Sequence, residues 1–372
     1  MQGFTAVSTG GDEPAYDEAV GDKPRHGETP SFDGGMLASM VALLAVMAVM
    51  VAVASAGPND VVAGVAGTPM VVVYDGYGQP DGFRVSGRVL HDPGRTPEAG
   101  GDGAMRNLVR TMADLNSREV PRVNLTVTIA GLSYSTTSDS DGMFQVRVKG
   151  LSPASALPVG PVPVEAMLVV GGAVGRGTLH VVPASGMALV SDIDDTVMKT
   201  WVTDKGRMAQ TVLLKNGAQI EAVVGAAAAY RQARVNGVDA VFYISSSPQN
   251  LYPRLRYFLE HHGFPAGPMF LKNLGDDSLL AHDSYKLERL ERIAADVPGV
   301  RFVLVGDSGE RDPEIYREFR RRHPARVTGI IIRLVPGSKH LEPARFADIV
   351  TVDDAWPVDA SVIDMTHTPR RE

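Results

Sequence analysis

Two carboxylates, separated by one residue, follow an apolar run near the middle of the chain. The run Met187–Ser191 leads into Asp192, Ile193 and Asp194. Side chains of a strand repeat every two residues, so both carboxylates are expected on one side of a strand end. Such a pair attracts a hard divalent cation, which cancels the mutual repulsion. With a metal bound, one carboxylate can attack phosphorus while the other transfers a proton. The alternative is an ordinary acidic turn exposed to solvent.

Three later segments supply other residue types that this chemistry needs. Ser245 lies in a hydroxyl-rich turn after an apolar run, Lys286 lies near the start of a helical pattern, and Asp307 follows another apolar run. Strands that alternate with helices form a parallel sheet, and ligands bind at the carboxyl ends of its strands. We therefore expect Asp192, Ser245 and Asp307 to meet at one rim of such a sheet.

In order and residue type, these segments resemble the four motifs of the haloacid-dehalogenase-like phosphatases. They are most similar to one branch, the phosphatidate phosphatases of the actin-patch-protein type. The resemblance is strong over residues 187–336 and looser over 69–185. The sequences that carry it are Asp-Ile-Asp-Asp-Thr at 192–196, Tyr-x-Ser-x-Ser-Pro at 243–248, Gly-Phe-Pro-x-Gly-Pro at 263–268 and Gly-Asp-Ser-Gly-x-x-Asp-Pro-Glu-Ile-Tyr at 306–316.

The resemblance implies a catalytic role for four residues. Asp192 is expected to be the nucleophile that forms an aspartyl-phosphate. Asp194 is expected to act as general acid and then as general base, and to offer its backbone carbonyl to the metal. Ser245 is expected to bind the phosphoryl oxygens, and Lys286 to neutralise the nucleophile and the phosphate. A lysine on a helix is otherwise a solvent-exposed residue.

The expected cofactor is Mg²⁺, because the implied ligands are few, all oxygen, and leave room for water and phosphate. Asp307 is the expected direct ligand in the last motif, beside Asp192 and Asp194. Asp312 is expected to bind through water or to orient Asp307. Since Pro313 follows it, Asp312 also fits a helix N-cap.

Further residues are weaker candidates for the same site. Ser246 and Lys272 are expected to contact substrate, although serines at this position also cap helices. Asp195 is expected either to orient the loop or to face solvent. Trp201 and residues 213–215 are candidates for a small flap over the site, and burial in the core explains them equally well.

The pattern of the chain predicts an α/β protein in several parts. Residues 69–185 alternate as short strands between turns and predict a small all-β, sandwich-like domain. Within them, residues 105–115 are amphipathic and predict a short helix. Residues 186–336 alternate strands and helices and predict a parallel sheet, which the resemblance implies is the doubly wound sheet of a haloacid-dehalogenase-like domain. Residues 337–372 predict a C-terminal tail.

The N-terminal region predicts a disordered acidic tail over 1–35 and then a single transmembrane helix over 36–56. This second segment carries no charge and has the length of roughly 20 residues that a membrane helix needs. The basic residues Lys23 and Arg25 precede it, which favours a cytoplasmic N-terminus and an exported catalytic body. The alternatives are a signal peptide cleaved after Ala56, which gives a secreted protein, and a buried helix.

Composition narrows the function further. The formal net charge of −7 argues against nucleic-acid binding, and the absence of cysteine excludes thiolate catalysis and disulfides. The expected function is a Mg²⁺-dependent phosphatidate phosphatase, a phosphoric monoester hydrolase that acts on a lipid phosphate at a membrane surface and leaves diacylglycerol. A phosphatase of a small soluble ester and a membrane-tethered adaptor without activity are the alternatives.

Overall fold

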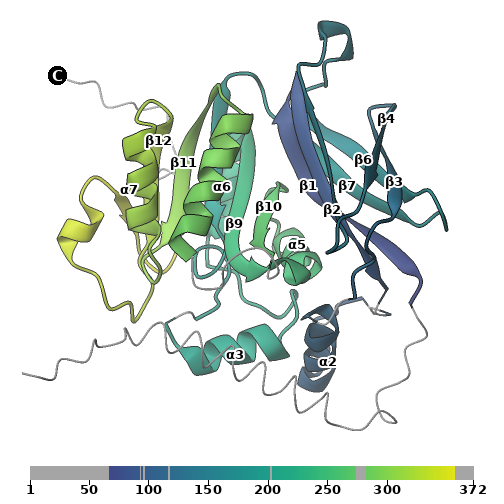
Figure 1. The fold of residues 1–372 in the computed structure, drawn as a ribbon. Coiled ribbons are helices and arrows are strands. Elements are labelled where there is room, and N and C mark those ends of the chain that lie inside the picture. The colour runs from purple at the N-terminus through teal and green to yellow at the C-terminus, as the bar shows by residue number, and fades with distance from the viewer. Residues whose placement is uncertain are drawn as a thin grey trace, which may run out of the picture. The chain divides into compact units, whose positions relative to one another are not determined.

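The computed structural model describes residues 67–356, apart from 93, 95–96, 116–117, 202 and 274–281. These residues form two β-sheets, one mostly antiparallel and one parallel (Figure 1). The predicted acidic tail over 1–35 and the apolar segment 36–56 lie outside the described residues, as does the end of the chain from 357.

The first sheet has seven strands in the order β4-β3-β6-β7-β1-β2-β5. Neighbours are antiparallel except β1 and β7, which run parallel. Alternation gives the sheet one buried face: in β6, Val162, Val164, Ala166 and Leu168 point inward and the residues between them are exposed. The strands are β1 (Pro69–Gln79), β2 (Gly82–His91), β3 (Asn124–Ile129), β4 (Leu132–Thr137), β5 (Met143–Lys149), β6 (Gly160–Leu168) and β7 (Val174–Val181).

This sheet corrects the predicted sandwich. Its two edge strands approach each other, and Thr136 Oγ1 of β4 donates to the Gln145 carbonyl of β5 at 3.1 Å. The seven strands therefore form a single, nearly closed, barrel-like sheet around one core instead of two stacked sheets. Alternation along a strand sets which face is buried, and a stacked pair and a curled sheet both satisfy it.

The second sheet has six parallel strands in the order β10-β9-β8-β11-β12-β13. Helices cover both faces of this sheet. Alternate residues of its strands therefore pack into two separate cores, one on each face. The first core includes residues of α4 (Ala226–Val235) and α5 (Tyr252–His261), and the second those of α6 (His282–Asp296) and α7 (Asp312–Arg322). The strands are β8 (Gly186–Asp192), β9 (Ala240–Pro248), β10 (Met269–Lys272), β11 (Val300–Asp307), β12 (Val327–Arg333) and β13 (Val350–Val352).

The parallel sheet continues past residue 336, where the sequence predicts the start of a tail. Strand β13 pairs with β12, and Trp356 is buried in the first core. The described residues also form three short 3₁₀ helices: η1 (Pro153–Ser155), η2 (Gln249–Leu251) and η3 (Pro343–Phe346).

No helix in the described part of the chain is long and apolar enough to cross a membrane. The longest, α6, has 15 residues, fewer than the roughly 20 that a spanning helix requires. This finding stands against the predicted transmembrane helix over 36–56, a segment outside the described residues, and against the single-pass membrane location with an exported catalytic body. That prediction depended on the hydropathy of residues 36–56 and, for its orientation, on Lys23 and Arg25.

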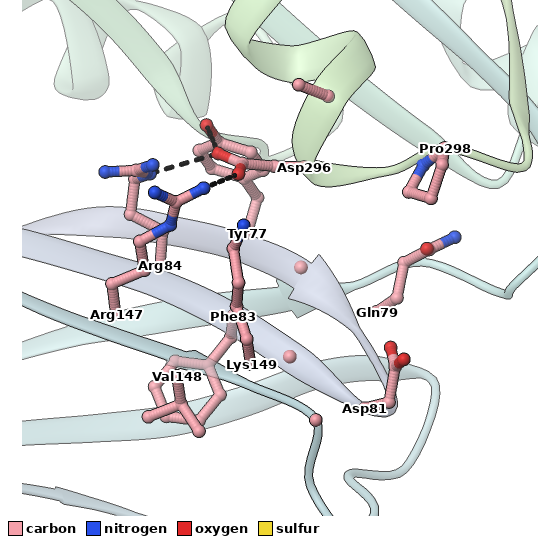
Figure 2. A pocket seen from close by; sticks show the side chains of 14 residues that line it. Tyr77, Gln79, Asp81, Phe83, Arg84, Arg147, Val148, Lys149, Asp296 and Pro298 are labelled. Carbon is pink, nitrogen blue, oxygen red and sulfur yellow. Dashed lines mark hydrogen bonds and ion pairs between the residues drawn. The ribbon is translucent and has the colours of Figure 1, made fainter.

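The two sheets are joined through the last residue of α6. Asp296 accepts hydrogen bonds from Tyr77 Oη at 2.8 Å, Arg84 Nε at 3.1 Å and Arg147 Nη2 at 2.7 Å (Figure 2). These three donors lie on β1, β2 and β5 of the first sheet. A second connection is formed by α2 (Ala104–Leu115), which follows β2 and packs beside α3 (Lys205–Leu214), which follows β8 (Figure 1).

Candidate active site

The central strands of the parallel sheet bring three predicted residues to one rim. Strand β8 lies between β9 and β11, and all three run in the same direction. Asp192 ends β8, Asp307 ends β11, and Ser245 lies near the end of β9. All three side chains are buried. The structure therefore has the predicted convergence.

Lys286 of α6 reaches this rim and is surrounded by carboxylates. Its Nζ lies 2.9 Å from Asp192 Oδ1, 2.6 Å from Asp312 Oδ1 and 2.9 Å from Glu310 Oε2. Burial disfavours the ammonium charge, yet the three acids hold the pKa of Lys286 well above its ordinary value. Lys286 is thus a fixed buried cation, as the motif order predicts, and the residue before it, Tyr285, is buried too.

Three carboxylates of the rim are close enough to share a cation. Asp192, Asp307 and Asp312 each offer an oxygen, and these oxygens all lie within 4.8 Å of one another. Asp307 Oδ1 accepts from the backbone N–H groups of Gly309 at 2.6 Å and Glu310 at 3.2 Å. Its Oδ2 is buried and has no hydrogen-bond partner in the described part of the chain.

This arrangement fits a hard divalent ion. Burial raises the pKa of Asp192 and of Asp307 well above the ordinary value, and neighbouring carboxylates raise both further. A buried oxygen without a hydrogen-bond partner, in a set of ligands that are all oxygen, suits Mg²⁺, and the charge of the ion would favour the ionised form of each acid. Asp192 and Asp307 are the residues best placed to hold it.

Asp312 has a different role from that of a cap. It is the first residue of α7, and its Oδ1 accepts from Lys286 while its Oδ2 accepts from the Asp307 backbone N–H at 3.3 Å. Gly306 permits this approach, because a Cβ there would lie 2.3 Å from Asp312 Oδ2. Asp312 therefore orients Asp307 and Lys286 at once.

Asp194 lies beside the hydroxyl-rich turn of β9. Its Oδ2 accepts from Ser245 Oγ at 2.7 Å and from Ser247 Oγ at 3.1 Å. Burial raises the pKa of Asp194 to about 6, although the hydrogen bond from Ser245 lowers it. A carboxyl group with this pKa can donate a proton near neutral pH and then accept one, which suits the expected acid and base role.

Residues 187–334 match the family described as phosphatidate phosphatase APP1, catalytic domain. This segment covers β8 to β12 and the rim residues described above, so the predicted family resemblance is confirmed for it.

Two curated relatives are similar to part of this chain. The phosphatidate phosphatase APP1 of Saccharomyces cerevisiae (strain ATCC 204508 / S288c) is 32% identical over 171 residues, which are 44% of this chain and 29% of the relative. An uncharacterized protein of Schizosaccharomyces pombe (strain 972 / ATCC 24843) is 28% identical over 157 residues, 41% of this chain and 26% of that protein. This chain therefore spans less than a third of either relative.

Among solved structures, a carbohydrate acetylesterase from Xanthomonas citri is similar at 9% sequence identity. The match covers 69% of this chain and 65% of the chain of the acetylesterase. Its TM-score of 0.25 is too low to carry an inference about the fold.

The structure holds Asp195 in the loop after β8, as one of the two predictions for this residue states. Asp195 has a positive φ of 50° and is buried. Its Oδ1 accepts from the backbone N–H groups of Thr200 and Trp201, each at 2.9 Å. Its carbonyl accepts from Arg333 Nη1 at 2.6 Å, and Arg333 also pairs with Asp354. Asp195 thus fixes the chain that leads to α3.

The structure places the two expected substrate contacts on β10 and β9. Lys272 is buried at the end of β10, where its Cα pairs with Pro248 and its Nζ lies 5.5 Å from the Tyr285 ring centroid. Ser246 Oγ is buried with no hydrogen-bond partner among the described residues. It therefore differs from its neighbours Ser245 and Ser247, which both bond Asp194.

Sequence reasoning missed two contacts of the rim. Glu310 bonds Lys286, and Thr196 Oγ1 donates to Asp192 Oδ2 at 3.0 Å. Both residues lie inside recognised motifs. Their place within the motifs could have marked them as candidates. The sequence does not show, however, which way their side chains point.

Proposed function

We propose that this protein is a Mg²⁺-dependent phosphomonoesterase that removes phosphate from phosphatidate or a related lipid phosphate and leaves diacylglycerol. The observation that carries the proposal is the buried group of Asp192, Asp307 and Asp312 around Lys286. Such a group places a nucleophilic carboxylate, a cation and candidate metal ligands at one point.

The reaction follows from the roles of this chain's residues. An oxygen of Asp192 attacks phosphorus, the bond from phosphorus to the lipid oxygen breaks, and Asp194 gives its proton to that oxygen. Water then attacks the aspartyl-phosphate, Asp194 takes a proton from the water, and Asp192 is released with inorganic phosphate. Lys286 and Ser245 hold the phosphoryl oxygens during both steps. Mg²⁺ on Asp192, Asp307 and the Asp194 carbonyl would supply charge neutralisation for the incoming phosphate.

The lipid substrate is supported by similarity. The Saccharomyces cerevisiae relative is named a phosphatidate phosphatase, and the family model of the same description matches residues 187–334, which include the rim. A lipid phosphate and a small soluble ester present the same phosphoryl group to Asp192. The chemistry at the rim is therefore common to both, and the substrate must be tested separately.

The decisive test assays the full chain on phosphatidate in mixed micelles and on a panel of soluble phosphate esters, each with Mg²⁺ and with chelator. We expect Mg²⁺-dependent release of phosphate from phosphatidate, and loss of turnover in Asp192→Asn. Exposed Asp204→Asn on the N-terminal cap of α3 is the matched control and should keep full activity. Activity in Asp192→Asn, or in chelator, contradicts the mechanism. A strong preference for soluble esters contradicts only the lipid substrate.

A further inference from the structure

Helix α2 presents its apolar side to solvent and its polar side to the protein. Met105 is 71% exposed and Val109 is 63% exposed, with Leu108 and Met112 half-buried beside them. These four positions follow the i, i+3, i+4, i+7 spacing that places side chains on one face of a helix. The buried positions are all polar: Asn107, Arg110, Thr111 and Asp114. A helix on a soluble domain normally has the opposite arrangement.

Hydrogen bonds hold the polar face inward. Asn107 Nδ2 donates to the Leu214 carbonyl at 2.9 Å and to Gln219 Oε1 at 2.6 Å. Arg110 Nη2 donates to Asp102 Oδ2 at 3.0 Å, and Asn216 Nδ2 contacts that carboxylate at 3.2 Å. Rolling the helix to bury its apolar face would leave these groups without partners in the interior, which is costly. The exposed apolar face is thus a fixed feature.

The same helix borders the catalytic rim. Asn250 Nδ2 of η2, directly after the serine turn of β9, donates to the Asp114 carbonyl at 3.1 Å. The C-terminal end of α3 is bound to Asn107, and the chain before α3 is bound to Asp195. Both connections lead to loops that follow catalytic strands. The apolar face of α2 therefore lies on the side of the domain where the rim opens.

The exposed charges near this face belong to ion pairs. Within α2, all of which the structure describes, Arg106 is the exposed charged residue, with a side chain 68% exposed, and it pairs with the buried Asp102 at 3.0 Å. On neighbouring α3, Arg207 has a side chain 58% exposed and pairs with Asp204 at 3.4 Å. The four residues of the face carry no charge, as contact with acyl chains requires, and the exposed guanidinium of Arg106 beside them can also meet an anionic headgroup.

We propose that the face formed by Met105, Leu108, Val109 and Met112 docks on the lipid surface that carries the substrate, as a peripheral contact beside the catalytic rim. This inference rests on the proposed function, because it is the lipid phosphate that makes such a surface relevant. When this face contacts the lipid surface, the phosphate headgroup of a lipid comes close to Asp192 while its acyl chains stay in the lipid phase.

The absence of cysteine allows a direct test in the full chain. Met105→Cys carries an environment-sensitive fluorophore, and the protein is mixed with phosphatidylcholine vesicles that contain a minor fraction of phosphatidate. We expect a blue shift on vesicles at position 105 and no shift at the control Val235→Cys, which lies on α4 and is 78% exposed in the parent protein. Emission that is already blue without vesicles shows that another segment of this chain covers the face, and overturns the proposal.

A second test measures vesicle binding by sedimentation. Met105→Gln/Val109→Gln should weaken binding by about a hundredfold, because two side chains leave the acyl region and each is worth about tenfold. The ratio of vesicle turnover to turnover of a monomeric short-chain ester should fall in parallel, whereas Val235→Gln should change neither quantity. Unchanged binding in the double variant, or no vesicle binding by the parent protein, overturns the proposal. Binding that depends on Met105 and Val109 without any turnover supports the docking face and contradicts the proposed function.

Discussion

Lys286 Nζ lies 2.6 Å from Asp312 Oδ1, and the two side chains are 2% and 0% exposed. The other oxygen of Asp312 accepts from the Asp307 backbone N–H. One carboxylate at the start of α7 therefore fixes the cation from α6 and the acidic loop after β11. This relationship explains how residues far apart in the sequence keep one geometry.

Removing the cation should affect both stability and catalysis. Lys286→Met leaves several buried carboxylates without a partner, so we expect the free energy of unfolding to fall by about 3–5 kcal/mol. The turnover number should fall by about a hundredfold or more, since a preorganised charge is lost at the phosphoryl site. Denaturant unfolding and steady-state kinetics measure the two effects. Lys339→Met, at an exposed lysine, should change neither, and a fully active Lys286→Met would contradict the assigned role.

Mg²⁺ should stabilise the folded protein through Asp307. At a free Mg²⁺ concentration of a hundred times the dissociation constant, binding adds about 2.7 kcal/mol to the free energy of unfolding, which is seen as a higher melting temperature. Asp307→Asn should remove this response, because the unpartnered Oδ2 is replaced by an uncharged group. Without metal the variant should be at least as stable as the parent protein, because the raised pKa of Asp307 means that its ionised form is disfavoured in the fold. An equal Mg²⁺ response in both proteins would show that the ion binds elsewhere.

Asp194 should set a pH limit on activity. If its protonated form donates to the leaving oxygen, kcat/KM should decrease as the pH rises through about 6. Ser245→Ala removes a hydrogen bond that favours the carboxylate form of Asp194. The pH at which kcat/KM falls should therefore be higher in this variant, while the maximum rate decreases. A pH–rate profile of both proteins on one substrate measures the displacement. A shift to lower pH would contradict the assignment.

The same pKa has a consequence for stability. Because the pKa of Asp194 in the fold is above its ordinary value of 3.8, the folded state binds this proton more tightly than the unfolded state. The contribution of Asp194 is therefore fully present below about pH 4 and is lost as the pH rises through about 6. Asp194→Asn should remove that part of the pH dependence, which unfolding curves between these values can detect.

The stability of the protein should depend on the hydrogen-bonding oxygen of the Asp195 side chain more than on its charge. Asp195→Asn keeps an oxygen for the Thr200 and Trp201 N–H groups and tolerates the positive φ, so we expect a change below about 1 kcal/mol. Asp195→Ala leaves both N–H groups unpaired in a buried loop and should cost about 2 kcal/mol or more in unfolding free energy. Equal stability of the two variants would contradict this.

Asp296 should couple the two sheets. Asp296→Ala removes the acceptor of Tyr77, Arg84 and Arg147, and we expect a loss of about 2 kcal/mol in unfolding free energy. A double-mutant cycle with Arg84→Ala isolates the pair. The control is Glu165→Ala, whose partner Arg176 is exposed, and whose loss should cost less than about 1 kcal/mol. Additive effects of Asp296→Ala and Arg84→Ala would show that the contact contributes nothing.

Much of the parallel domain was accessible from the sequence. Runs such as 240–244 and 302–305 coincide with β9 and β11, because fully buried strands of a parallel sheet are continuous and apolar. Carboxylates at the ends of such runs must lie on one edge, which is why Asp192 and Asp307 could be placed together. Strand β13 and helix α3 were not predicted, since three residues of strand and a helix with few apolar positions give weak patterns.

The sequence by itself determined the order of motifs, the residue types at the rim and the period of each element. Only the tertiary structure decided where particular side chains point. Asp312 faces Lys286 instead of capping α7, the all-β strands close into one curled sheet, and α2 turns its polar face inward. Periodicity shows that a helix has two unlike faces, but the face that is buried depends on which partners the rest of the molecule offers. For α2 those partners are polar groups near α3, contributed by residues more than a hundred positions away.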